Sequence, residues 1–535
     1  MRLYLFVILA FLKVGSTNAQ EQLSQDDLFS VYKYRIAIEI NDTTNAIKAI
    51  AEIKVSLVNQ TDSITLDLVT KGDEEGMIVD SVLLNGKRIG FSHRNNRLTL
   101  PGSGSDDNSP GSHSKYVNYD VHYHGIPADG LIISSNMHGN RTFFTDNWPN
   151  RAHNWFPCLD HPSKRSKIDF IITAPSHYQV IATGIKHRTV NLPGKRTTHY
   201  WASSVPVPAK VMAFAAAEFA HEYNDDIDGI PYSNWVYPQN MEEGFYDFNV
   251  TPEIFRFFTG TIGPYPFEKI ANVQSTTRYG GMENAGNIFY HEKSITGKQS
   301  NKLTVVHEIA HQWFGNSVSE SDWPHLWLSE GIATWLTDWY VEQNYGKEEY
   351  AKRLESHRKT IIDYAGKRLA PVVDLHVENY SDLLNPNSYQ KGSWILHMLR
   401  LKIGEDNLLN GLVEFHEKYS MSHACTKAFM EVLEKTSGED LEQFFDDWLY
   451  SAGHPVISLS SGFSNGRLNM ELLQTQPHKM AFSFPLDVRF ILADGTVKDQ
   501  TFDIIFRRHE FLLDFPSEPV EIILDPEIRL LFEKK

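Results

Sequence analysis

Residues 305–316 read Val-Val-His-Glu-Ile-Ala-His-Gln-Trp-Phe-Gly-Asn, and Glu330 follows in the sequence Trp-Leu-Ser-Glu-Gly. On a helix, the i, i+4 spacing of His307 and His311 places both imidazoles on one face, where they can bind one tetrahedral zinc ion. Glu330, nineteen positions after His311, supplies a carboxylate. Two histidines and one carboxylate leave a fourth position open, which is typical of a hydrolytic zinc site and not of a structural one.

Glu308 directly follows the first histidine, so its carboxylate is expected beside the open position. There it can accept a proton from a water molecule that the metal has made more acidic. The alternative for the His-Glu-x-x-His pattern alone is an ordinary surface helix. The added carboxylate of Glu330 favours the catalytic interpretation.

Two more segments flank this motif: Tyr-Gly-Gly-Met-Glu-Asn-Ala-Gly at 279–286 and Ser-Tyr-Gln-Lys-Gly at 388–392. With all four motifs in this order, the chain resembles the gluzincin aminopeptidases, the family of aminopeptidase N and leukotriene-epoxide hydrolase. The resemblance implies one zinc ion per chain and peptide substrates with a free amino end. It also implies an α+β multidomain fold, with a saddle-like antiparallel β domain, a thermolysin-like, mainly α-helical catalytic domain and a small β-sandwich.

In that family the Gly-x-Met-Glu-Asn segment binds substrate, which implies such roles here for Gly280, Gly281, Met282, Glu283 and Asn284. Glu283 would bind the α-ammonium group, and this suits an exopeptidase, which must recognise a charged terminus next to the scissile bond. Tyr389 would donate a hydrogen bond to the oxyanion, an interaction often worth about 3 kcal/mol. The alternatives are a turn carboxylate and a tyrosine packed in a core.

Residues 154–162, Asn-Trp-Phe-Pro-Cys-Leu-Asp-His-Pro, resemble the segment that ends the substrate-facing stretch of the family's first domain. Some relatives carry a glutamine a few residues upstream that helps to bind the amino terminus. This chain has Phe-Thr-Asp-Asn-Trp-Pro-Asn at 144–150 instead. Asp146 is the predicted substitute.

Hydrophobic periodicity divides the chain after residue 19 into three domains. Alternation of apolar and polar residues, as in 34–40 and 53–57, predicts antiparallel strands for a β domain over 20–222. Helical spacing at 303–314, 328–340 and 394–401 predicts the zinc catalytic domain over 223–453. Strands return in 454–535, with an Asp-Gly turn at 494–495, and predict the β-sandwich. The Gly-, Ser- and Asp-rich stretch 101–114 is predicted to be a surface loop.

Composition restricts the partners. The 535 residues, 41% of them apolar, can form several cores. The 50 basic and 67 acidic residues give a net charge of -17 without a basic cluster, which argues against nucleic acid and anionic membranes as partners. Oligomeric state stays open. Cys158 and Cys425 are predicted to be free, with a disulfide between them as the alternative.

The first residues resemble a secretory signal. A basic start is followed by an apolar stretch at 3–12 and by Thr-Asn-Ala at 17–19, which predicts a signal peptide over 1–19 and a secreted or periplasmic protein. An uncleaved anchor is the alternative. No later segment is apolar over the roughly 20 residues that a bilayer requires, so no membrane span is expected in the mature chain.

The chain ends after the sandwich, so we expect a form without the large helical domain that many family members carry.

Three other functions compete with a zinc aminopeptidase. A lipid-epoxide role is disfavoured because residues 381–388 lack a tyrosine and Asp382 is their sole acid. A zinc endopeptidase would not need Glu283, and an inactive scaffold would usually have lost one of the motif residues. Both remain alternatives to a zinc aminopeptidase.

Overall fold

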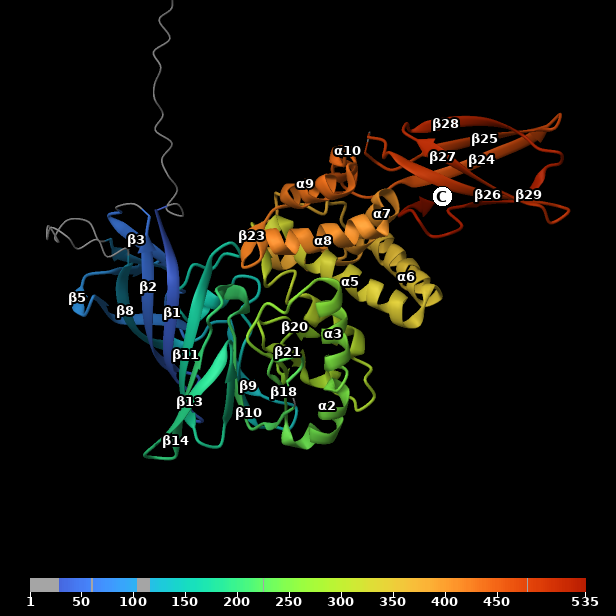
Figure 1. Ribbon diagram of the computed structural model, residues 1–535. Coiled ribbons are helices and arrows are strands. Elements are labelled where there is room, and N and C mark those ends of the chain that lie inside the picture. Colours follow the sequence, from blue (N-terminus) through green and yellow to red (C-terminus); the bar gives the residue numbers. More distant parts are fainter. Residues whose placement is uncertain (1–27, 59–60, 103–115, 225, 479) are drawn as a thin grey trace, which may run out of the picture.

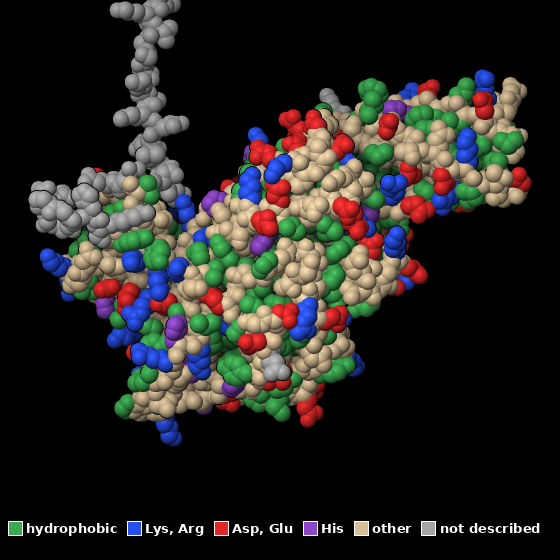
Figure 2. All heavy atoms as spheres, in the orientation of Figure 1, with side chains coloured by type: hydrophobic (Ala, Val, Ile, Leu, Met, Phe, Trp, Pro, Cys, Tyr) green, Lys and Arg blue, Asp and Glu red, His purple; other side chains and the backbone are tan. Residues whose placement is uncertain are grey.

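The computed structural model describes residues 28–58, 61–102, 116–224, 226–478 and 480–535. A β domain and a β-sandwich lie at opposite ends of the molecule, with a helical domain between them (Figure 1). Lys, Arg, Asp and Glu side chains are spread over all three domains on the face shown in Figure 2. The predicted signal peptide, 1–19, and most of the predicted loop at 101–114 lie outside the described residues.

The first domain is built on a nine-stranded sheet in the order β13-β14-β11-β1-β2-β8-β4-β5, with β15 paired to β11. Its strands are β1 (Phe29–Glu39), β2 (Ile47–Leu57), β4 (Gly76–Leu84), β5 (Lys87–Ile89), β8 (Tyr116–Ile126), β11 (Arg165–Pro175), β13 (Ile185–Leu192), β14 (Arg196–Ala202) and β15 (Val207–Pro208). Alternate residues of β1 and β2 are buried, as the sequence pattern predicts. One pairing departs from the prediction: β1 and β11 run parallel, because they are joined through other strands and not by a hairpin.

A second sheet of this domain, in the order β12-β16-β10-β9, contacts the catalytic domain, where the rings of Phe144 and Phe289 lie 5.6 Å apart. It consists of β9 (Leu131–Ser135), β10 (Arg141–Thr145), β12 (Gln179–Ala182) and β16 (Phe214–Ala217). A three-stranded sheet is formed by β3 (Ser63–Asp67), β6 (Ser92–Arg94) and β7 (Arg97–Pro101). The segment after β10 leads through Trp148 to a 3₁₀ turn at Ala152–Asn154.

The catalytic domain opens with a five-stranded sheet, β17-β18-β19-β21-β20, in which β18, β19 and β21 are parallel. These strands are β17 (Ala220–Tyr223), β18 (Tyr232–Val236), β19 (Ile270–Ser275), β20 (Gly281–Met282) and β21 (Ile288–His291). The predicted boundary between residues 222 and 223 therefore falls inside β17. β20 is the edge strand, so the predicted substrate-binding segment lies at an open sheet edge.

Helices form the rest of this domain: α2 (Met241–Phe248), α3 (Thr251–Thr261), α4 (Lys302–Ala310), α5 (Trp327–Tyr345), α6 (Lys347–Ala365), α7 (Gly392–Ile403), α8 (Glu405–Tyr419), α9 (Thr426–Ser437) and α10 (Glu442–Phe445). A short parallel pair, β22 (Val318–Glu320) and β23 (Ser422–Ala424), lies beside them. The predicted helix at 303–314 is shorter in the structure. It ends at Ala310; just beyond it the His311 ring lies 3.0 Å from the carbonyl oxygen of Phe314, and Gly315 adopts a positive φ of 118°.

The C-terminal domain is the predicted sandwich of two sheets, β28-β25-β24-β30 and β27-β26-β29. Its strands are β24 (Val456–Ser464), β25 (Arg467–Gln474), β26 (Phe484–Leu492), β27 (Val497–Ile504), β28 (Arg508–Asp514), β29 (Pro519–Leu524) and β30 (Glu533–Lys534). Both cysteines are free, as predicted. Among the described residues, no helix is both long and apolar enough to cross a bilayer.

Buried polar contacts join the first two domains. Arg165 of β11 donates to Ser319 and to the carbonyl of Asn316, both at 2.8 Å. Lys210 and Glu320 form an ion pair at 2.6 Å, with both side chains almost fully buried. Because Asn316 and Glu320 follow the histidine helix directly, these contacts hold the first domain against the predicted metal site.

Candidate metal and substrate-binding site

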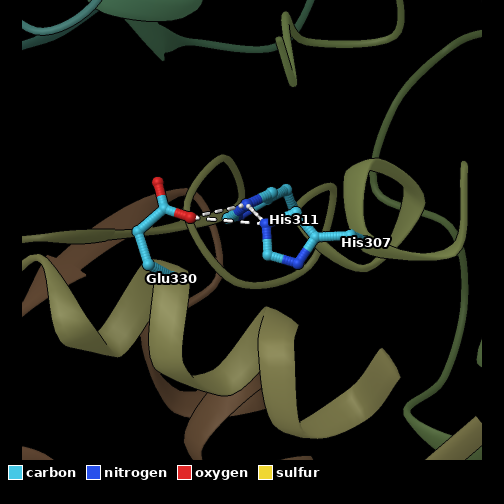
Figure 3. A group of neighbouring side chains, drawn as sticks. All are labelled: His307, His311 and Glu330. Atoms are coloured by element: carbon cyan, nitrogen blue, oxygen red, sulfur yellow. Dashed lines mark hydrogen bonds and ion pairs between the residues drawn. The ribbon is translucent and has the colours of Figure 1, made fainter. Parts of the chain in front are cut away.

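Three side chains from two helices converge as the motif predicts. His307 lies in the last turns of α4, His311 caps that helix, and Glu330 lies in the first turn of α5. The Nε2 atoms of the two histidines are 3.0 Å apart, and Glu330 Oε2 lies 3.4 Å from His307 Nε2 and 3.1 Å from His311 Nε2. Figure 3 shows the rings and the carboxylate pointing toward one another.

This triangle fits a zinc ion. Ligand atoms at about 2.0–2.1 Å from a tetrahedral zinc ion are separated from one another by about 3.3–3.4 Å, close to the three distances found here. Glu330 Oε2 is buried and lies within ion-pair distance of both imidazole Nε2 atoms. Although burial opposes it, the two imidazoles hold the pKa of Glu330 below its usual range, so the carboxylate is ionised.

A second layer of contacts orients His311. Its Nδ1 atom lies 3.0 Å from the carbonyl oxygen of Phe314, which can only accept a hydrogen bond, so Nδ1 carries the proton. Ser329 Oγ lies 3.2 Å from the same nitrogen. The Nε2 lone pair is thereby directed toward His307 and Glu330, the arrangement expected of a metal-binding histidine.

Glu308 lies where a general base is expected. Its carboxylate is buried, and carboxylate or imidazole atoms of Glu308, Glu283 and His311 lie within 4.8 Å of one another. Burial raises the pKa of Glu308 well above its usual range; His311 opposes this shift, and Glu283 adds to it. A carboxylate of this kind holds an accepted proton more firmly than one in water, which suits transfer from a water molecule to a leaving group.

Glu283 has an unsatisfied carboxylate. It is buried, and its Oε1 atom has no hydrogen-bond partner within the described part of the chain. Its main chain is fixed from the histidine motif, because Gln312 Nε2 donates to the Glu283 carbonyl at 3.1 Å and Asn316 Nδ2 donates to the same oxygen. The main chain that carries the predicted amine-binding group is therefore fixed, and the carboxylate keeps one acceptor oxygen unpaired among the described residues. Sequence reasoning did not single out Gln312 or Asn316, although both stand in the quoted motif.

Tyr389 lies in a π-helical turn, Asn387–Lys391, at the start of α7. Its ring stacks on that of His307, with centroids 6.1 Å apart. α5 and α7 approach closely after Glu330, since a Cβ on Gly331 would lie 2.9 Å from Gly392 Cα. Burial raises the pKa of Tyr389 well above its usual range, and the neighbouring carboxylates reinforce the shift. The phenol therefore keeps its proton and can donate it to an oxyanion.

These residues surround a cavity of about 400 Å³. The predicted residues that line it are Gly280, Gly281, Met282, Glu283, His307, Glu308, His311, Glu330 and Tyr389. Trp148, Tyr279, Thr304 and Leu384 complete the lining and were not predicted as site residues. Asn284 is buried beside Glu283 but is not among the lining residues.

Asp146 is also absent from the lining. It is fully buried, and Arg151 Nη2 lies 2.6 Å from its Oδ1 atom. The main-chain N–H of Arg278 donates to its Oδ2 atom at 3.3 Å. A contact between Asp146 and the substrate amine stays a prediction, and the side chain that this segment presents to the cavity is Trp148.

Comparison with known proteins agrees with the family resemblance of the sequence motifs. The description "Peptidase M1 N-terminal domain" matches residues 31–210, and "Peptidase family M1 domain" matches residues 246–448. Aminopeptidase A of Gloydius brevicauda is 29% identical over 67% of this chain and 39% of its own length. Human glutamyl aminopeptidase is 27% identical over 68% of this chain and 40% of its own length, and aminopeptidase 2 of Candida albicans is 25% identical over 73% and 44%.

The chain thus spans less than half the length of these relatives. Among solved structures, Legionella pneumophila aminopeptidase A in complex with aspartic acid superposes with a TM-score of 0.78 at 16% identity. The match covers 95% of this chain and 59% of that one. It shows that the two chains share the same fold.

Proposed function

The chain belongs to the peptidase M1 family, and from this membership and the site we propose that it is a zinc-dependent aminopeptidase. It would hydrolyse the first peptide bond of peptides with a free amino end. The observation that carries the proposal is the buried carboxylate of Glu283, which has one oxygen left unpaired by the residues that the structure describes and lines the same cavity as the His-His-Glu triangle.

His307, His311 and Glu330 would hold one zinc ion per chain. When bound, zinc would lower the pKa of a water molecule and polarise the substrate carbonyl. Glu308 accepts a proton from the attacking water and delivers it to the departing amine, so one carboxylate acts as base and then as acid. Tyr389 donates a hydrogen bond to the carbonyl oxygen as negative charge develops on it.

Glu283 determines which bond is cut. Its carboxylate pairs with the substrate α-ammonium, which places the first peptide bond beside Glu308 and Tyr389. The edge strand β20 offers its backbone to the peptide by strand addition. An acetylated or internal segment would leave the Glu283 charge buried and unpaired, which is costly. The site therefore supports an aminopeptidase better than an endopeptidase.

The test uses a matched pair of fluorogenic peptides, one with a free amino end and one acetylated, with and without a zinc chelator. Chelator-sensitive cleavage of the free peptide alone is expected. Equal cleavage of both peptides would show an endopeptidase, and cleavage of neither would overturn the proposal. The Glu308→Gln variant keeps all three metal-binding side chains, so it should retain zinc in elemental analysis and lose several decades of kcat.

The proposal includes export of the enzyme from the cell that makes it. It is supported by the sequence of residues 1–19, with a basic start, an apolar stretch and small residues at the cleavage position. Amino-terminal sequencing of protein recovered outside the expressing cells should begin near Gln20. Protein that keeps residues 1–19 and pellets with membranes would instead indicate an anchor.

A further inference from the structure

Part of the cavity lining has no role in binding metal, activating water or holding the ammonium group. It consists mainly of four apolar or aromatic side chains: Trp148, Tyr279, Met282 and Leu384. With the substrate ammonium at Glu283 and its carbonyl at the metal site, the side chain of the first residue is the group left to contact them. We call these four residues the first-residue subsite.

Trp148 is the largest member of the subsite and is rigidly placed. Its ring makes edge contacts with Tyr279 and Trp323, with centroids 6.1 Å apart in both pairs. The indole nitrogen is itself buried and meets no acceptor in the described ranges. Since the N–H is shielded, the ring presents carbon atoms to the cavity. A substrate side chain here meets an apolar surface and no hydrogen-bond donor from this residue.

Positive charge near the subsite is already neutralised. Neither lysine nor arginine belongs to the described lining of the cavity. The basic groups around it pair with carboxylates: Arg151 with Asp146 at 2.6 Å and Asp129 at 2.9 Å, Arg278 with Asp129 at 2.7 Å, and Lys210 with Glu320 at 2.6 Å. The carboxylates of Glu283, Glu308 and Glu330, in contrast, line the cavity directly.

From this arrangement we propose that the enzyme selects peptides whose first residue is large, uncharged and apolar, and that it rejects acidic first residues. This selectivity rests on the proposed aminopeptidase function. An acidic side chain would lose its hydration against the rings of Trp148 and Tyr279 without gaining a cation. A leucine or phenylalanine side chain would gain contact with the same surface.

The primary test measures kcat/KM on fluorogenic amides of Leu, Phe, Ala, Lys and Glu. We expect Leu and Phe to exceed Ala at least about tenfold, and to exceed Glu by more than about a hundredfold. A preference for Glu or Lys would overturn the subsite assignment and leave the aminopeptidase proposal standing. No cleavage of any of the five amides would overturn the proposed function itself.

Two variants test the physical cause. Leu384→Ala should lower the ratio of Leu to Ala cleavage several-fold, whereas Leu375→Ala, at a site 65% exposed and outside the lining, should not. Asp129→Asn removes the carboxylate paired with Arg278, so the ratio of Glu to Leu cleavage should rise at least about threefold at low ionic strength and fall back with added salt.

Asp228→Asn is the matched control, because Asp228 forms an exposed ion pair with Arg256 elsewhere on the catalytic domain. It should leave both ratios unchanged. Thermal unfolding of every variant verifies folding. If Leu384→Ala and Asp129→Asn, both folded, leave their ratios at wild-type values, the apolar wall and the neutralised cations do not control selectivity, and the proposal is wrong.

Discussion

Replacing Gly281 by alanine should disable the general base without unfolding the protein. An added Cβ at this position would lie 2.3 Å from Glu308 Oε1, 2.5 Å from its Cδ and 2.6 Å from its Cγ. The Gly281 backbone is not in the left-handed region, so alanine is conformationally acceptable there. The clash falls on the movable end of a side chain, and the carboxylate must shift by roughly 1 Å to restore an ordinary contact.

A displacement of about 1 Å at a reacting group can cost about a hundredfold in rate. We therefore expect kcat/KM of Gly281→Ala to fall about a hundredfold, equivalent to about 2.7 kcal/mol of transition-state stabilisation. The zinc content should remain at one ion per chain, because His307, His311 and Glu330 are not among the atoms that the new Cβ approaches.

The preceding glycine provides the control. A Cβ on Gly280 meets nothing within 4 Å, so Gly280→Ala should retain activity within about threefold. The assay is kcat/KM on a leucine amide, with zinc content and thermal unfolding measured on the same samples. Equal losses in the two variants, or full activity in Gly281→Ala, would refute the placement of Glu308 against β20.

Four further predictions follow from the site and the domain contacts. Tyr389→Phe should lower kcat about a hundredfold with little change in KM, because the phenol acts on the oxyanion and not on bound substrate. Glu283→Ala should lose most of the preference for free over acetylated peptides. An unchanged preference would contradict the role of Glu283 in binding the substrate ammonium group. Lys210→Met leaves Glu320 buried without its partner and should lower the free energy of unfolding by about 3–5 kcal/mol in urea, with a smaller loss when Glu320→Gln is added. Burial lowers the pKa of His397 to about 4, whereas in the unfolded chain this side chain has the ordinary histidine pKa of about 6.5. Below pH 6.5 the unfolded chain therefore binds the proton more readily than the folded one, which favours unfolding. This residue's contribution to stability should decline from pH 6.5 toward pH 4, by about 2 kcal/mol at pH 5, and His397→Gln should show a correspondingly flatter dependence on pH.

The convergence of His307, His311 and Glu330 was predictable from sequence because its geometry is local. The spacing of His307 and His311 fixes their relation on one helix, and Glu330 lies at the start of the next long apolar segment. The order of a β domain, a helical domain and a second β-rich domain was also predictable, since strands and helices have different hydrophobic periodicities. The end of α4 was missed because the apolar pattern continues through the buried Trp313 and Phe314, although the helix itself ends at Ala310.

Residues placed by distant contacts could not be predicted in the same way. Trp148 reaches the cavity only because β10 and the second sheet of the first domain pack against the catalytic domain. From sequence, Asp146 had the better chemistry for binding an amine, but its partner Arg151 could not be identified before the fold was known. The parallel pairing of β1 with β11 depends on long-range contacts for the same reason.

Trp148 and the metal-binding residues belong to different domains, and this division has an evolutionary consequence. The segment from β10 to the 3₁₀ turn can change by mutation without altering α4 or α5. Under the proposed function, the first domain contributes to the choice of the first residue but not to the cleavage of the bond. Substitution of Trp148 would then change substrate range while the inherited hydrolytic machinery stayed intact.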